Sequence, residues 1–280
     1  MNFMTWIAVF TLTSIFGLNA VGLDDAKGYN KNSSLQWQWA TNALEKYPWT
    51  GHERVLDIGS GDGKVSAFIS KECTHGLVVG LDISPNMNAF ASSLFRPDTF
   101  STLLFQQGDI AHLPFENQFD LVTAFCSLHY VVDYKSALSA IQKSLRAHGK
   151  LLFVGPGRDN TSVANISETL IQTEKWALYF PTFTKQRVYF TKDEYTTILQ
   201  ESGFTPIYFD VTHDKVSFAN KQALTNWLRP LINYISHLSP DLQDDFLLDL
   251  TNIMMQSAIA TPDESVVLES TLFECLAERQ

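Results

Sequence analysis

The sequence predicts an α/β fold: a seven-stranded, mostly parallel sheet with helices on both faces and an inserted helical cap. Between residues 54 and 158, short apolar segments alternate with helical segments, as in a doubly wound sheet with right-handed crossovers. One of these strands leads through a glycine turn directly into a helix. After residue 158 longer helical segments interrupt the alternation, and these predict the cap.

The glycine turn follows the first strand in the run Val55-Leu56-Asp57-Ile58-Gly59-Ser60-Gly61-Asp62-Gly63-Lys64. Glycine tolerates positive φ and has no Cβ, so a ligand can approach the backbone closely. The spacing is G-x-G-x-G and not the G-x-G-x-x-G of a dinucleotide site. Asp57 suits a positively charged ligand such as a sulfonium amino acid and would repel a pyrophosphate. The alternative is a strand-to-helix turn that binds nothing.

The other elements before residue 158 follow from apolar periodicity and end signals. Ser33 or Ser34 can cap the first helix, and Pro48 ends it. Ser84-Pro85 opens a helix after the second strand. The expected helices are Leu35–Tyr47, Val65–Cys73 and Tyr134–Arg146, and the expected strands after the first are Leu77–Ser84, Thr102–Gln106, Phe119–Phe125 and Lys150–Gly155.

Polar residues follow the second and third strands, at the edge where open α/β sheets bind ligands. Asp82 can accept both ribose hydroxyls of a nucleoside, although an Asp-x-Ser helix cap is the competing interpretation. After Gly108, Asp109 can accept a hydrogen bond from an adenine amino group, while Ile83 and Ile110 sandwich the ring.

The elements after residue 158 are less regular. The sequence predicts helices at Ile166–Tyr179, Thr191–Ser202, Lys221–Ser236 and Pro240–Ser257, with a capping box at the start of the second. It predicts strands at Thr205–Val211 and Val266–Leu276. We expect the last strand to be antiparallel and to lie in the edge region of the sheet.

Four motifs together resemble those of the class I S-adenosylmethionine (SAM) methyltransferases, from about Gly28 to the end of the chain. They are Asp57-x-Gly59-x-Gly61-x-Gly63, Asp82, Gly108-Asp109-Ile110 and Phe119-Asp120-Leu121-Val122. The resemblance implies a Rossmann-like sheet and SAM as cofactor. The cofactor-binding residues that follow from it and from the motifs are Asp57, Gly59, Ser60, Gly61, Gly63, Asp82, Ile83, Gly108, Asp109, Ile110 and Phe125.

Within that class, the chain is most similar to the juvenile hormone acid and trans-aconitate methyltransferases, which methylate small carboxylic acids. The likeness lies in Tyr29-x-Lys31-Asn32-Ser33-Ser34-x-x-x-x-Trp39-Ala40, in the run from Phe125 to Tyr130 and in residues 218–228. The predicted organisation is an apolar segment at 1–23, a SAM-binding core at 24–158 and a helical cap segment at 159–190. The remainder of the core follows at 191–280, with a helical insertion at about 219–262.

The expected reaction is methyl transfer to a small, apolar carboxylic acid. In the hormone-acid enzymes a glutamine and a tryptophan hold the substrate carboxylate. Gln36 matches the first, and Tyr130, whose hydroxyl can donate a hydrogen bond, stands at the second. A carboxylate is ionised at neutral pH, so it needs alignment and no general base. The aromatic side chains predicted to line the acceptor pocket are Trp39, Trp176, Tyr179 and Trp227; ordinary cap core is the alternative for each.

Other functions stay open at this point. His129 follows the fourth strand and can serve as the general base that a phenol, amine or protein acceptor would need. A SAM-binding protein without turnover is a further alternative. The net charge of −10 argues against nucleic acid as partner, because phosphate binding requires clustered Lys and Arg. The sequence indicates no oligomeric state.

The N-terminal segment and the cysteines are relevant to the cellular location of the protein. Residues 1–23 are mostly apolar and contain no Lys, Arg, Asp or Glu, which suits a secretory signal, a membrane anchor or an upstream extension. A cytosolic cofactor favours the cytoplasm; the protein would be exported or membrane-anchored if this segment acts in targeting. Cys73, Cys126 and Cys275 show no C-x-x-C spacing, so we expect buried thiols and no metal site.

Overall fold

The computed structural model describes residues 25–158, 162–184, 187–259 and 265–280. The apolar segment predicted at residues 1–23 lies outside these ranges. Within them, no helix has the length and apolar character needed to cross a membrane.

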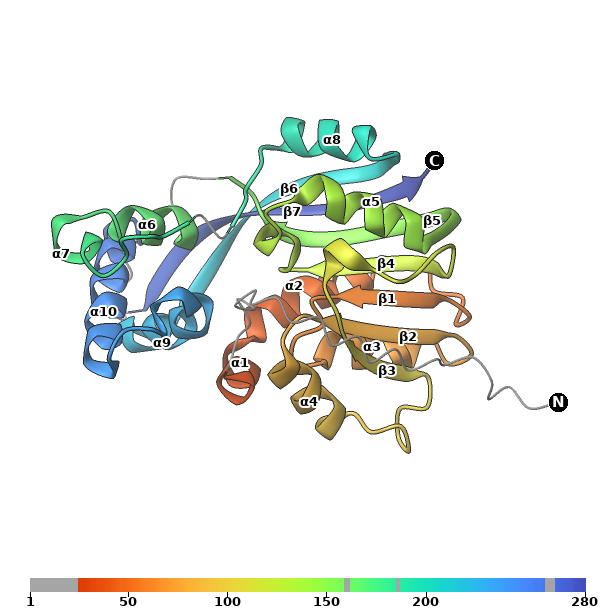
Figure 1. Ribbon diagram of the computed structural model, residues 1–280, viewed down its shortest axis with the longest axis horizontal. Helices are drawn as coiled ribbons and strands as arrows, with labels where there is room; N and C mark the ends of the chain where they lie inside the picture. The colour runs from red at the N-terminus through yellow and green to blue at the C-terminus, as the bar shows by residue number, and fades with distance from the viewer. Residues whose placement is uncertain (1–24, 159–161, 185–186, 260–264) are drawn as a thin grey trace.

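Seven strands form one sheet in the order β3-β2-β1-β4-β5-β7-β6 (Figure 1). Strands β1 to β5 pair in parallel, and β7 runs antiparallel to both β5 and β6. The predicted α/β fold class is therefore confirmed. The strands are β1 Arg54–Ile58, β2 Leu77–Asp82, β3 Leu103–Gln107, β4 Phe119–Phe125, β5 Leu145–Pro156, β6 Phe204–Phe218 and β7 Val266–Arg279.

Helices cover both faces because successive strand residues point to opposite sides. Val55 and Leu121 pack toward α2 and α3, whereas Leu56 and Val122 pack toward α5 and α8. These strands are buried on both faces, which explains their nearly continuous apolar sequences. The helices around the sheet are α2 Ser34–Leu44, α3 Lys64–Glu72, α4 Pro85–Leu94, α5 Tyr134–Ser144 and α8 Lys192–Glu201.

Helix starts follow the caps that the sequence predicts. The Ser84 side chain accepts a hydrogen bond from the backbone of Met87 at the start of α4. Thr191 and Glu194 form a reciprocal capping box at the start of α8. These bonds satisfy backbone N–H groups that have no partner inside the helix.

The chain order explains where a ligand can bind. Strands β2 and β3 lie on one side of β1, and β4 and β5 lie on the other. At such a reversal of strand order, the loops leaving the carboxyl ends diverge and open a crevice. The glycine turn leaves β1 at this point, and residues 126–130 leave β4 beside it.

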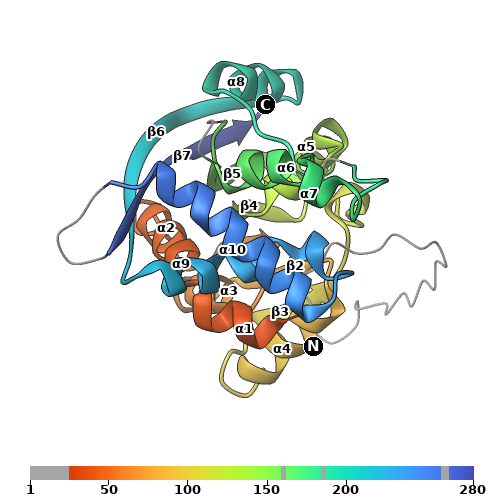
Figure 2. The ribbon, with the colours of Figure 1, turned by 90° about the vertical axis from the view of Figure 1, so that its left-hand side faces the viewer.

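Beyond these carboxyl ends lies the helical cap, which we define as α6 Val163–Leu170, α7 Glu174–Ala177, α9 Lys221–Leu228 and α10 Pro240–Gln256. Figure 1 shows it as a separate layer at one end of the sheet, and in Figure 2 it faces the viewer. Its helices share a hydrophobic cluster with the outer ends of β6 and β7. Strand β5 pairs with β7 only at residues 272–278, while β6 pairs along β7 as far as Val266.

Two predicted cap helices are shorter or divided in the structure. The helix predicted at Ile166–Tyr179 is divided into α6 and α7, with Thr173 in extended backbone between them. The helix predicted at Lys221–Ser236 ends at Leu228, and two 3-10 turns follow, Arg229–Leu231 and Asn233–Ile235. Pro230 lies in the first turn, and proline removes a helical hydrogen-bond donor.

One element was not predicted. Helix α1, Ala26–Asn32, precedes α2 and is capped by Asp25, which accepts a hydrogen bond from the backbone of Gly28. The region between residues 29 and 36 is therefore mainly helical, and its polar side chains are available to contact the glycine turn.

Candidate active site

The glycine turn has a conformation that requires glycine. Gly59, Gly61 and Gly63 have φ values of +70°, +53° and +82°. A Cβ added to Gly59 would lie 2.3 Å from the Cβ of Ser127, and one on Gly63 would lie 2.7 Å from the Phe105 ring. Backbone conformation disfavours larger residues at all three positions, and space also excludes them at Gly59 and Gly63.

Asp82 ties the end of β2 to the glycine turn. Its two carboxylate oxygens accept from the backbone N–H groups of Gly61, at 2.9 Å, and Ser84, at 2.8 Å. Burial raises the pKa of Asp82, and these two bonds oppose the rise. Each oxygen keeps a lone pair for a further donor. The Ser84 bond belongs to the helix cap, and it is compatible with ribose binding.

Asp57 is 2% exposed and lies below the turn. Its oxygens accept from the hydroxyls of Ser66, at 2.6 Å, and Thr123, at 2.8 Å. Burial raises its pKa to about 6, although the two hydroxyl bonds oppose this. The charged form of Asp57 is therefore disfavoured in the folded protein unless a positive group approaches it.

This pKa predicts an unusual pH dependence of stability without cofactor. A carboxyl group with a raised pKa lowers the free energy of unfolding above pH 6, and this cost disappears as the pH falls through 6 toward 4. Relative to Asp57→Asn, the wild type should gain about 1 kcal/mol in free energy of unfolding between pH 7 and pH 5. Denaturant titrations of both proteins at pH 7 and pH 5 measure this difference in the free energy of unfolding. Parallel pH curves for the two would contradict the prediction.

A small cavity beside the turn contains several predicted cofactor residues. Asp57, Gly59, Ser60 and Phe125 line it, together with residues that come from α1 and α2. The other predicted residues lie at the neighbouring strand ends. Ile83 is 42% exposed, Asp109 accepts from the backbone of Ala111, and Ile110 is buried in the sheet core. Gly108 donates its N–H to the Asp82 carbonyl oxygen.

Asp62, inside the glycine turn, holds the N-terminal helices in place. One of its oxygens accepts from Asn30 and from Ser33, both at 3.1 Å, and lies 3.1 Å from the Lys64 ammonium. Lys64 also donates to the Asn30 carbonyl oxygen at 2.6 Å. This role of Asp62 was not predicted from the sequence.

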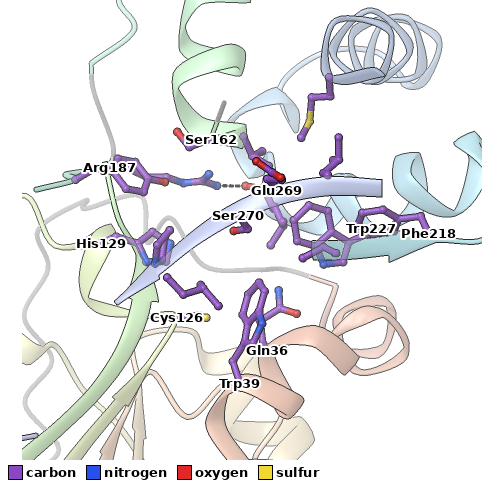
Figure 3. Close-up of a pocket in the computed structure, with 18 of the residues that line it drawn as sticks. Gln36, Trp39, Cys126, His129, Ser162, Arg187, Phe218, Trp227, Glu269 and Ser270 are labelled. Atoms are coloured by element: carbon purple, nitrogen blue, oxygen red, sulfur yellow. Dashed lines mark hydrogen bonds between the residues drawn. The ribbon is translucent and has the colours of Figure 1, made fainter. Parts of the chain in front are cut away.

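A larger cavity of about 320 Å³ lies between the strand ends and the cap (Figure 3). Gln36 and Trp39 reach it from α2, while Phe218 and Trp227 lie across from His129 and Arg187. Tyr29 and Gln36 line both cavities, so the two adjoin. The larger one is mostly apolar, with walls that include Trp39, Val216, Phe218, Trp227, Met254 and Leu272.

Five of the seven residues predicted for the acceptor side line this cavity: Gln36, Trp39, His129, Tyr130 and Trp227. Trp176 and Tyr179 do not, and their assignment to the pocket is wrong. Trp176 is fully buried in the cap core, where it packs on Phe246 and donates to Asp249. Tyr179 is 41% exposed at the surface of the cap.

His129 lies in the 3-10 turn Leu128–Tyr130 and is buried against aromatic rings. Its ring is 4.3 Å from that of Tyr130 and stacks at 5.7 Å on Tyr189. Burial lowers the pKa of His129 well below its usual range, and the Arg187 cation adds to the effect. The imidazole is therefore neutral at neutral pH and is a weak proton acceptor.

Arg187 is the main cavity residue that was not predicted from the sequence. It is 5% exposed, and its guanidinium donates to the Leu231 carbonyl oxygen and lies 4.8 Å from the centre of the Tyr130 ring. It sits in a segment without helical or strand periodicity, so no sequence pattern marked it. Cys126 also lines the cavity, while Cys73 and Cys275 are buried as predicted.

Several buried polar atoms around the two cavities lack partners among the described residues. They are Ser60 Oγ, Gln36 Oε1, His129 Nδ1 and Trp227 Nε1. Buried polar groups are normally hydrogen-bonded, so unpaired ones suit a ligand that carries donors and acceptors. Together with the glycine turn and Asp82, they fit a cofactor with a ribose and an amino acid part.

A mostly parallel sheet with this strand order, a G-x-G-x-G turn and an acid at the end of β2 defines a class I SAM-dependent methyltransferase. Residues 50–203, more than half of the chain, match the methyltransferase domain family. The chain belongs to this family and is a SAM-dependent enzyme.

The chain is similar to two insect proteins and to a bacterial structure. Juvenile hormone acid O-methyltransferase of Drosophila melanogaster is 26% identical over 251 residues, which cover 85% of this chain and 80% of that protein. The Bombyx mori enzyme of the same name is 32% identical over 165 residues, 55% of this chain and 57% of that one. The YcgJ protein of Bacillus subtilis superposes with a TM-score of 0.63 at 16% identity, covering 87% of this chain and 99% of that one.

Proposed function

We propose that the enzyme transfers a methyl group from SAM to the carboxylate of a small, largely apolar acid. The observation that carries this proposal is the mostly apolar cavity that adjoins the glycine turn through Tyr29 and Gln36. Similarity to the two juvenile hormone acid O-methyltransferases supports an acid as the acceptor. An apolar wall of this size suits a hydrocarbon portion in the acceptor.

We assign the cofactor to the crevice along the ends of β1, β2 and β3. When bound, SAM supplies the methyl group as part of a sulfonium ion. The free lone pairs of Asp82 would accept from the ribose hydroxyls, and Ile83 and Asp109 would contact the adenine. Asp57 and Ser60 would lie near the amino acid part, where a positive ammonium compensates the buried carboxylate.

The main task of the protein in this reaction is to align the acceptor carboxylate with the methyl group. An acceptor carboxylate is already ionised at neutral pH, so no group has to remove a proton. Gln36, on the wall that the two cavities share, would hold it next to the methyl group. Orientation of this kind contributes roughly 7–11 kcal/mol to lowering a barrier. The cap helices would shield the apolar part of the cavity from water.

A phenol or amine acceptor is the second candidate. Its support is the buried Nδ1 of His129, which has no hydrogen-bond partner among the described residues, lines the same cavity and could take a proton. The low pKa of His129 favours the carboxylate, because a weak base contributes little to deprotonating a phenol.

The deciding experiment is transfer from labelled SAM to a panel of acids, from tricarboxylic to long-chain isoprenoid and fatty acids. Methyl esters are released by mild base, whereas phenol ethers and methylamines are not. Base-labile label on an apolar acid supports the proposal. Label that resists base, on a phenol or an amine, would establish the second candidate.

Replacing Gln36 with alanine tests the proposed contact with the acceptor. We expect kcat/KM for the acid to fall about tenfold or more, since a hydrogen bond to a charged group contributes about 1.5–3 kcal/mol. Gln38→Ala is the matched control, because Gln38 is an exposed glutamine on the same helix. Equal kinetics for the two variants on every accepted acid would remove Gln36 from this role.

A further inference from the structure

The acceptor cavity contains a buried positive charge with no carboxylate partner in the described part of the chain. Two other arginines near the cap and the late strands pair with acids: Arg158 with Glu194 at 3.0 Å, and Arg229 with Asp244. Arg187 is far more buried than either, and its contacts within the described ranges are all to uncharged groups. A guanidinium stays protonated at any physiological pH.

The contacts of Arg187 hold the guanidinium in place without neutralising it. One nitrogen donates to the Leu231 carbonyl oxygen, the plane lies over the Tyr130 ring, and the Tyr189 side chain interacts with it. A guanidinium has five N–H donors, so several stay available. Glu269 also borders the cavity, but it is exposed to solvent and forms no ion pair with Arg187 within the described ranges.

We propose that Arg187 binds the carboxylate of the acceptor as its counter-ion and so makes the cavity selective for acids. The inference deepens the proposed function and rests on it. Removing a charge from water costs several kcal/mol unless an opposite charge compensates it, and an anionic substrate supplies that compensation. Arginine and carboxylate can also match as a planar pair with two hydrogen bonds. Arg187 and His129 lie on the same side of the cavity, across from the apolar residues Phe218 and Trp227 (Figure 3).

The same charge discriminates between substrate and product. Transfer forms an O–CH₃ bond on the carboxylate and breaks the S–CH₃ bond, and the electron pair of that bond stays on sulfur. The ester product is uncharged, so it loses its attraction to Arg187 and binds more weakly than the acid did. Arg187 also favours the charged ground state at least as much as the transition state, in which charge is being consumed. Its contribution should therefore appear in KM and not in kcat.

The test compares Arg187→Met and Arg187→Lys with wild type, using the apolar acid that wild type methylates best. Methionine keeps an unbranched apolar stem and removes the charge. We expect Arg187→Met to raise KM about 30-fold or more, as for loss of one partner of a buried charge pair, with kcat unchanged or higher. Arg187→Lys should recover part of the loss. Arg229→Met, on an exposed ion pair, is the matched control and should keep wild-type KM.

Equilibrium dialysis with SAM shows whether each variant has kept its fold. A variant with normal SAM binding and unchanged KM, or with reduced kcat at unchanged KM, would overturn the proposal. If both variants lose SAM binding, the role of Arg187 is tested on the wild-type enzyme alone. The acid should then inhibit transfer to a second acid at least 30-fold more strongly than its own methyl ester, and equal inhibition overturns the role of Arg187. Wild type that methylates no acid at all refutes the proposed function instead, which is a separate outcome.

Discussion

Replacing Gly59 with alanine should reduce SAM affinity at least 100-fold and lower the free energy of unfolding by about 2–5 kcal/mol. The added Cβ would lie 2.3 Å from the Cβ of Ser127, closer than two carbon atoms can approach. Position 59 also has a φ of +70°, which side chains other than glycine rarely adopt. The turn must therefore move, and with it the Gly61 N–H that holds the Asp82 carboxylate.

Two variants separate the clash from the backbone strain. Gly51 has a φ of +86°, but the nearest atoms to an added Cβ lie 3.6 Å away, so Gly51→Ala carries the strain alone. We expect it to cost about 1 kcal/mol and to leave SAM binding intact. Ser127→Gly combined with Gly59→Ala removes the clashing atom and should restore part of the affinity. Calorimetry with SAM and denaturant unfolding measure both effects. A Gly59→Ala protein that behaves like Gly51→Ala would refute the steric argument.

The second large effect should come from Asp62→Ala. This carboxylate is 5% exposed and is the shared partner of Asn30, Ser33 and Lys64. Without it, the partly buried Lys64 ammonium loses its counter-charge, and α1 and α2 lose their main polar contact with the glycine turn. We expect a loss of about 3 kcal/mol in free energy of unfolding, less than for a fully buried pair because Lys64 is partly exposed to solvent.

Activity should fall with stability in Asp62→Ala, since Gln36 and Tyr29 belong to the segment that is released. We expect KM to rise for both SAM and the acceptor, because these two residues line both cavities. Asp98→Ala is the matched control: Asp98 makes an exposed ion pair with Arg96 at 3.8 Å, and its loss should cost less than about 0.5 kcal/mol. Wild-type KM values for both substrates in Asp62→Ala would contradict the docking role.

The sheet could be predicted because its strands carry their own signals. Phe119–Phe125 has the same bounds in prediction and structure, since a strand buried on both faces is a nearly continuous apolar run, interrupted here only by Asp120 and Thr123. The outer half of β6 could not be predicted. It contains His213, Asp214 and Lys215, which break the apolar alternation, and only the pairing with β7 makes it a strand.

The acceptor side was predicted in part for a similar reason. Gln36 and Trp39 follow from their motif on one helix. The position of Trp176 was not predicted because it depends on contacts with Phe246 and Asp249. These residues are distant in sequence and become its neighbours only when α7 packs on α10. Arg187 carries no local signal, since an arginine in an irregular segment is usually at the surface. Its burial is a property of the assembled cavity.

The paired strands β6 and β7 have a consequence for how such an enzyme can diverge. Their inner halves are bonded into the sheet, while their outer ends carry Val216, Phe218 and Leu268 into the cavity that we propose for the acceptor. The crevice to which we assign the methyl donor lies at the ends of β1, β2 and β3, in the other half of the strand order. Substitutions on the outer ends can therefore change which acceptor is bound without altering the donor site. Related enzymes can in this way acquire new substrates for the same reaction.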